Sequence, residues 1–180
     1  YSRWSFRGKR GNRISNEQNQ HLGLASNKAI AKVFILKIHL GEHMKWASHL
    51  SAKNNIEACI DESIEAVRSQ MGGDAVHLTV IFVSPQFKDK YEEIPKLIRE
   101  RMDPGRFLGC SGGGIVGGGK EVEQQPALSI TCANLPDVEI KGIRSDTMDL
   151  PDQDTAPGVW REWLGVNAEK KPNFIFLADP

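Results

Sequence analysis

The chain has 180 residues, of which 39% are hydrophobic, and it carries 23 Lys/Arg against 23 Asp/Glu. This length and composition are typical of one globular domain, or of one domain with a tail. Residues 1–43 hold eight Lys/Arg against two Asp/Glu, and residues 44–180 hold fifteen against twenty-one. The acidic body argues against nucleic acid as the main partner. No apolar run reaches the ~20 residues of a membrane helix, and three cysteines without CxxC spacing argue against a disulfide framework.

The basic lead-in, residues 1–43, precedes the acidic body. Residues 1–32 are rich in Arg, Ser, Asn and Gln, which is the makeup of a disordered linker or of the tail of an organellar transit peptide. We therefore expect an intracellular protein, with the chloroplast or another organelle favoured over the cytoplasm. Residues 33–40 have the β-branched content of a strand, but the sequence leaves open whether they belong to the fold.

Two histidines in the lead-in have the spacing of metal ligands on one helix face. His39 and His43 are four residues apart, but Gly41 lies between them in a segment that is typical of a strand followed by a turn. We therefore predict no metal site, and no motif in the chain calls for a cofactor.

The body begins with a short candidate strand, residues 45–52, and then a helix. Asn54 and Glu57 have the spacing of a capping box, which places the helix start at this point. Apolar residues then recur every three or four positions, as on one face of a helix: Ile56, Ile60, Ile64, Val67 and Met71. Gly72 and Gly73 are expected to end this helix, and Cys59, beside the stripe, is expected in the core.

The next elements alternate between strand and helix. Residues 76–83 are almost continuously apolar, which is typical of a parallel strand covered on both faces. A turn over residues 87–93 and a helix over residues 95–102 follow, because Pro95 fits only the first turn of a helix. Residues 106–110 form the next strand. This order predicts an α/β fold of alternating strand–helix units with a mostly parallel sheet.

The second half of the chain is expected to add an antiparallel hairpin. Residues 127–133 alternate between apolar and polar, with Cys132 on the apolar side, and residues 138–143 follow after a short turn. A short helix over residues 158–164 and a strand over residues 173–178 complete the pattern. We expect residues 44–180 to be one domain that is incomplete at its C-terminus.

Residues 106–121 are the most unusual segment, because seven glycines occur among them. Repeated glycine exposes main chain, whose amide groups can bind an anion or a polar small molecule. In parallel sheets ligands bind beyond the carboxyl ends of the strands, and two such ends are expected to meet here. The predicted ligand-binding residues are Ser84, Gly109, Cys110, Ser111, Gly112, Gly113, Gly114 and Asp179.

Known glycine motifs fit this segment poorly. Residues 109–113 match the G-x-S-x-G elbow of hydrolases, but no helix is expected after Ser111 and no histidine follows His77. Residues 112–117 match the spacing of a dinucleotide fingerprint, again without the helix that this motif requires. The P-loop ending is absent. An enzyme that uses Cys110 or Ser111 remains an alternative hypothesis.

From about residue 46 onward the chain resembles the N-terminal module of the FIST (F-box and intracellular signal transduction) family. The matching pieces are VIFVSPQF, RFLGCSGGGIVGGGKEVEQQPALSI and FIFLADP. The resemblance implies a sensory domain for a small polar molecule such as an amino acid, without established catalytic residues. It also implies a possible link to ubiquitin-ligase components. A protein-interaction scaffold that docks through Trp160 and Trp163 is a further alternative.

Overall fold

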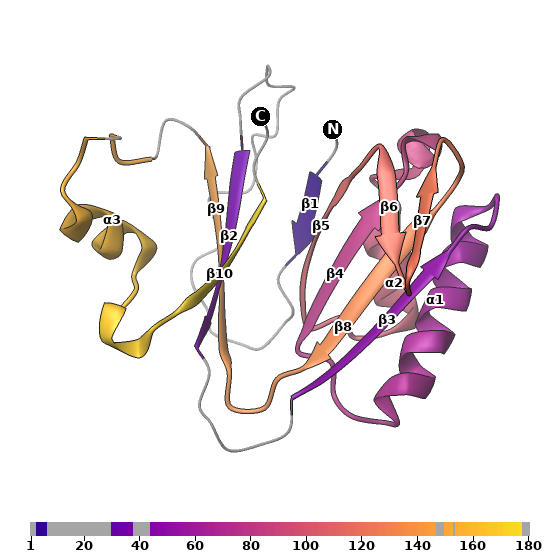
Figure 1. Ribbon diagram of the computed structural model, residues 1–180, viewed down its shortest axis with the longest axis horizontal. Helices are drawn as coiled ribbons and strands as arrows, with labels where there is room; N and C mark the ends of the chain where they lie inside the picture. The colour runs from indigo at the N-terminus through magenta and orange to yellow at the C-terminus, as the bar shows by residue number, and fades with distance from the viewer. Residues whose placement is uncertain (1–2, 7–29, 38–43, 147–149, 153, 178–180) are drawn as a thin grey trace. The chain divides into compact units, whose positions relative to one another are not determined.

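The computed structural model describes residues 3–6, 30–37, 44–146, 150–152 and 154–177 (Figure 1). They belong to two compact units. The first unit spans Tyr1–Gly8 and His39–Val138, and the second spans Lys9–Ile38 and Glu139–Pro180. No helix in the described part of the chain is long and apolar enough to cross a membrane.

A five-stranded sheet organises the first unit. In spatial order its strands are β1 (Arg3–Phe6), β5 (Arg106–Ser111), β4 (Leu78–Val83), β8 (Leu128–Asn134) and β3 (Lys45–Ser51). Among these strands only β4 and β5 run parallel, and the other neighbours are antiparallel. The α/β class is confirmed, but the prediction of a mostly parallel sheet is wrong. The reason is that β8 enters between β3 and β4 and runs antiparallel to both.

An antiparallel hairpin is present, but it is not formed by the residues that were expected to form one. β6 (Gly114–Gly117) pairs with β7 (Lys120–Glu123) inside the segment expected to be a glycine loop. The strands predicted at residues 127–133 and 138–143 do not pair with each other, because β9 (Glu139–Asp146) pairs with β2 (Ile30–Lys37). Ser129 is only 3% exposed, so β8 is buried on both faces and takes a central position.

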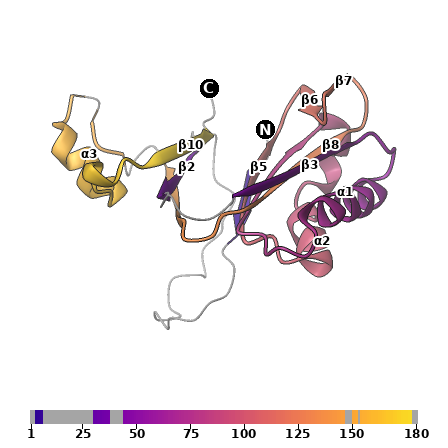
Figure 2. The ribbon, with the colours of Figure 1, turned by 60° about the horizontal axis from the view of Figure 1, so that its bottom comes forward.

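Two helices cover one face of this sheet (Figure 2). In α1 (Ile56–Met71) the N-cap is Asn55, whose side chain accepts a hydrogen bond from the Ala58 amide at 2.8 Å, so the predicted cap at Asn54 is wrong by one residue. Gly72 ends α1 in the left-handed conformation. A 3₁₀ segment, Pro85–Lys90, precedes α2 (Ile94–Arg101), which has its proline in the first turn, as predicted.

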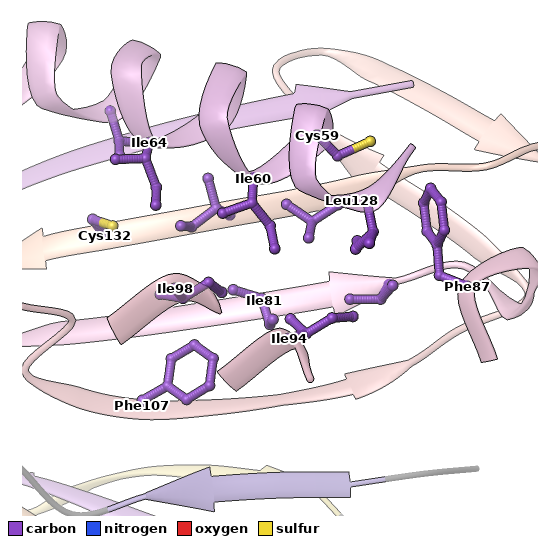
Figure 3. Packing of buried hydrophobic residues seen from close by; sticks show 14 of the residues in the cluster. Cys59, Ile60, Ile64, Ile81, Phe87, Ile94, Ile98, Phe107, Leu128 and Cys132 are labelled. Atoms are coloured by element: carbon purple, nitrogen blue, oxygen red, sulfur yellow. The ribbon is translucent and has the colours of Figure 1, made fainter. Parts of the chain in front are cut away.

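The core lies between these helices and the sheet (Figure 3). The whole predicted stripe of α1 is buried, as are Ile94 and Ile98 of α2 and Phe107 of β5. Cys59 and Cys132 are 0% exposed, as predicted for core residues, and neither forms a disulfide. Burial raises the pKa of both thiols above the ordinary value of 9.0.

The hairpin of β6 and β7 packs on the opposite face of the sheet. Gly117 lies so close to this face that an added Cβ would stand 3.1 Å from the Cβ of Ser129 and 3.2 Å from that of Leu50. Elsewhere on this face Val80 and Phe82 are only half-buried. β4 is therefore less completely covered than its continuous apolar sequence predicts.

The second unit contains a three-stranded antiparallel sheet in the order β10 (Asn173–Leu177), β2 and β9. It also holds α3 (Pro157–Leu164) and a 3₁₀ turn, Ala168–Lys170. In α3 the rings of Trp160 and Trp163 meet edge to face, with their centroids 6.1 Å apart. β1 and β2 both come from residues 1–43, so the basic lead-in supplies one strand to the five-stranded sheet and one to the three-stranded sheet.

Candidate functional site

The carboxyl ends of β4 and β5 meet at one edge of the five-stranded sheet. Val83 is the register partner of Ser111, and the Gly112 amide donates to the Val83 carbonyl at 3.1 Å. Because the strands are parallel, Ser84 and Gly112 leave the sheet at the same edge. The structure thus brings together two of the segments that the sequence nominates as a site.

Ser84 is an internal connection at this edge. It is 1% exposed, and its hydroxyl oxygen accepts a hydrogen bond from the Ala127 amide at 2.8 Å. Its own amide donates to the Ala127 carbonyl at 2.9 Å, and its carbonyl accepts from the Tyr91 hydroxyl at 3.0 Å. Ser84 therefore joins the end of β4 to the start of β8, and its side chain does not face solvent.

Tyr91 closes the edge from the helix side. It is 5% exposed, and burial raises its pKa above 10.0, while a hydrogen bond with the Ser111 side chain acts in the opposite direction. The phenol therefore stays neutral at physiological pH. With Ser84 and Ser111, which is 8% exposed, it forms a buried polar network behind the glycine segment. Sequence reasoning missed Tyr91, because the residue falls in the segment 87–93, which is expected to be a turn.

The glycines divide into packed and exposed positions. Gly109 is buried within β5, where a side chain would collide with the backbone of Ile81. Gly118 and Gly119 both have positive φ and form the two-residue turn of the hairpin. Gly112 is half-buried, whereas Gly113 is exposed and has open space where a side chain would stand.

Two carboxylates lie beside the exposed part of the segment. At Gly114 an added Cβ would stand 3.6 Å from Oε1 of Glu123 and 3.7 Å from Oε1 of Glu121. Both glutamates are exposed on β7. This edge therefore combines exposed main chain with negative charge, which favours a ligand that carries a cationic group. Sequence reasoning missed both residues, because the acidic stretch reads only as a solvated tail of the glycine segment.

Two further residues were predicted for the site, Cys110 and Asp179. Cys110 lies in β5, half-buried, next to Ser111. β6 follows Ser111 after two residues, so the G-x-S-x-G match does not form a strand-to-helix elbow. Asp179 lies outside the described residues. In the described part of the chain no group of three His, Cys, Asp or Glu side chains has the arrangement of a metal site.

Comparison with known proteins identifies the family. The model of the FIST N domain matches residues 77–180, which is more than half of the chain. The chain therefore belongs to the FIST family, whose domains are sensory modules of signal transduction. The matched range begins just before β4 and contains both strand ends of the candidate site.

The curated relatives are mycobacterial. An uncharacterized protein of Mycobacterium bovis is 24% identical over 119 residues, covering 66% of this chain and 29% of that protein. An uncharacterized protein of Mycobacterium tuberculosis is 24% identical over 96 residues, covering 53% of this chain and 25% of that protein. The chain thus spans less than a third of the length of these relatives. No solved structure matches the chain significantly.

Proposed function

We propose that this FIST module senses a small, polar, amino-acid-like molecule at the carboxyl ends of β4 and β5. The observation that carries the proposal is the exposed main chain of Gly113 and Gly114 at the rim of the sheet, next to Glu121 and Glu123. Amides of the segment bind the carboxylate or another polar group of the ligand. The two glutamates accept its ammonium group.

The buried network behind the segment gives this edge a fixed shape. Ser84, Tyr91 and Ser111 hold the strand ends together, and fully buried Ile115 anchors the start of the hairpin. Their hydroxyls act as supports, and the ligand contacts the glycine main chain in front of them. Ligand binding at this edge is expected to restrain β6 and β7. A protein partner then recognises the restrained hairpin.

A thermal-shift screen against free amino acids tests the proposal. A binder present at about 100 times its Kd stabilises the folded protein by about 2.7 kcal/mol. N-acetylated derivatives, which lack the ammonium group, are expected to give a smaller shift. Gly113→Val is expected to abolish the shift, whereas Gly158→Ala, an exposed glycine substitution in α3, should preserve it. A folded protein that no amino acid stabilises would contradict the proposal.

The family suggests ubiquitin-ligase components as the downstream partner. Co-purification from cells, with and without the stabilising amino acid, tests this part separately. A set of captured proteins that is unchanged by the ligand would remove the link between binding and signal while leaving binding itself intact.

A further inference from the structure

β1 pairs with the outer edge of β5, the strand that ends at the glycine segment (Figure 1). The register places Trp4 opposite Gly109 and Phe6 opposite Phe107. β5 lies within residues 77–180, which match the FIST N domain, whereas β1 comes from the basic lead-in. An edge of the matched domain is therefore occupied by a strand from outside the matched range.

The direction of the β5 amides shows which of them face β1. The Arg106 amide donates to the His77 carbonyl at 2.8 Å, on the side of β4. The amide that follows the strand, at Gly112, donates to the last carbonyl of β4 at 3.1 Å. Backbone groups alternate in direction along a strand. The Phe107 and Gly109 amides therefore point to the opposite side, where β1 lies.

β1 suits this edge in sequence as well as in backbone pairing. Trp4 and Phe6 lie opposite the two outward-facing amides, so they form the hydrogen-bonded pairs of the ladder. An aromatic residue opposite a glycine offsets the weak strand propensity of glycine. Residues 1–10 also carry four Arg/Lys and no Asp/Glu, whereas acidic residues are in excess in residues 44–180. This edge thus favours a basic segment with aromatic residues two positions apart.

β1 is short, and the chain leaves the first unit soon after it. β1 has four residues, whereas β5 has six. The segment Lys9–Ile38 belongs to the second unit, so β1 is held in the first unit by its own pairing. Ordering four residues costs conformational entropy, which offsets much of what their backbone hydrogen bonds contribute. β1 can therefore leave β5 while the rest of the first unit stays folded.

We propose that the outer edge of β5 is a strand-binding site that β1 occupies in cis, and that an extended, basic, aromatic segment of a protein partner replaces β1. The partner's strand forms the same ladder with β5, as in other cases of strand addition to a sheet edge. Arg3 lies opposite Cys110, so the occupied edge reaches the residue next to Ser111. The proposed amino-acid site lies beyond the end of β5, so either site can exist without the other.

A peptide with the sequence of residues 1–10, added to a full chain in which β1 cannot pair, tests the proposal. The double substitution Trp4→Pro and Phe6→Pro removes both β1 amides that face β5. Saturable NMR shifts of the Phe107 and Gly109 amides are expected when the peptide binds this variant. The unmodified chain should bind the peptide at least about tenfold more weakly, because β1 competes at the high effective concentration of a linked segment.

Ser5→Pro is the matched variant of the chain, because the Ser5 amide faces away from β5 and the ladder is kept. This variant should bind the peptide as weakly as the unmodified chain does. A control peptide that carries Trp4→Pro and Phe6→Pro has the same charge but cannot pair, and it should not shift the Gly109 amide. Equal binding of the two peptides, or equal binding by the two variants, would overturn the proposal. So would the absence of any saturable shift at Gly109 in the folded double variant.

Amide hydrogen exchange of the unmodified chain is a second measurement, which needs no variant. The Phe107 and Gly109 amides are expected to exchange faster than the Leu108 amide, which faces β4, because β1 opens without global unfolding. Equal protection of the three amides would show that β1 leaves only when the whole unit unfolds, and would overturn the proposed replacement. A dimer whose dissociation exposes the Phe107 and Gly109 amides would place β1 of a second copy at this edge and would overturn the assignment in cis.

Discussion

The side chain of Gln70 pairs with the backbone of Ser48 as a neighbouring strand would. Its Oε1 accepts from the Ser48 amide at 3.1 Å, and its Nε2 donates to the Ser48 carbonyl at 3.0 Å. β3 is the edge strand of the sheet, with β8 as its neighbour on one side. α1 therefore supplies one amide group that satisfies backbone groups at the outer edge of β3, where another chain would otherwise pair.

Gln70→Ala is expected to lower the free energy of unfolding by about 1 kcal/mol, because two hydrogen bonds at a solvent-exposed edge are lost. It should also increase self-association, which light scattering at rising protein concentration measures. Ser69→Ala, an exposed neighbour on the same helix, serves as the control. A Gln70→Ala protein as stable and as monomeric as the control would show that the pairing is incidental.

Ser84→Ala is expected to destabilise the protein by about 1–3 kcal/mol, because the buried Ala127 amide loses its acceptor. Tyr91→Phe should cost about 1 kcal/mol, since it removes the hydroxyl that donates to Ser84. Urea unfolding of the two variants measures both effects. If Ser84→Ala has the same free energy of unfolding as the unmodified protein, the buried polar network does not stabilise the ends of β4 and β5.

Gly117→Ala and Gly113→Ala make the same chemical change at positions with opposite surroundings. At Gly117 the new methyl group meets Ser129 and Leu50, so a loss of about 1–3 kcal/mol is expected as the hairpin is displaced from the sheet. At Gly113 the methyl group meets nothing within 4 Å, so stability should change little. Thermal unfolding distinguishes the two, and equal losses would contradict the described packing of the hairpin.

Stability should fall as the solution becomes alkaline. The folded state raises the pKa of the Cys59 and Cys132 thiols through burial, so the neutral thiol is favoured in the fold. Their contribution is fully present below the ordinary pKa of 9.0 and is lost as pH rises from that value through the raised folded-state pKa.

The measurement is urea unfolding at a series of pH values. A variant with alanine at both cysteines is expected to be less stable at neutral pH, because core volume is lost. It should also show a smaller decrease between about pH 8 and pH 10. If both proteins lose stability equally over this interval, the thiols are not the cause.

The local elements of the first unit could largely be predicted from the sequence. α1 was predictable because apolar residues recur along one face of it, which indicates that this face is buried. The start of α2 was predictable because Pro95 favours the first turn of a helix. The order of the strands was not predictable in this way. The position of β8 between β3 and β4 depends on pairing between residues far apart in the chain, which the local pattern does not encode.

The candidate site could be predicted only in outline. The shared edge of β4 and β5 follows from their parallel pairing, which the buried character of residues 76–83 indicates. The hairpin was missed because glycine is depleted in strands, although Gly118-Gly119 is a common two-residue hairpin turn. The role of Tyr91 depends on a tertiary contact with Ser84 that no spacing reveals.

The central claim is that a small polar ligand docks on exposed main chain at the end of β5, and an NMR titration with a panel of amino acids tests it most directly. The account predicts saturable shifts of the Gly113 and Gly114 amides with at least one amino acid, and their absence in Gly113→Val. No saturable shift at these glycines with any member of the panel, while the protein remains folded, would contradict the account.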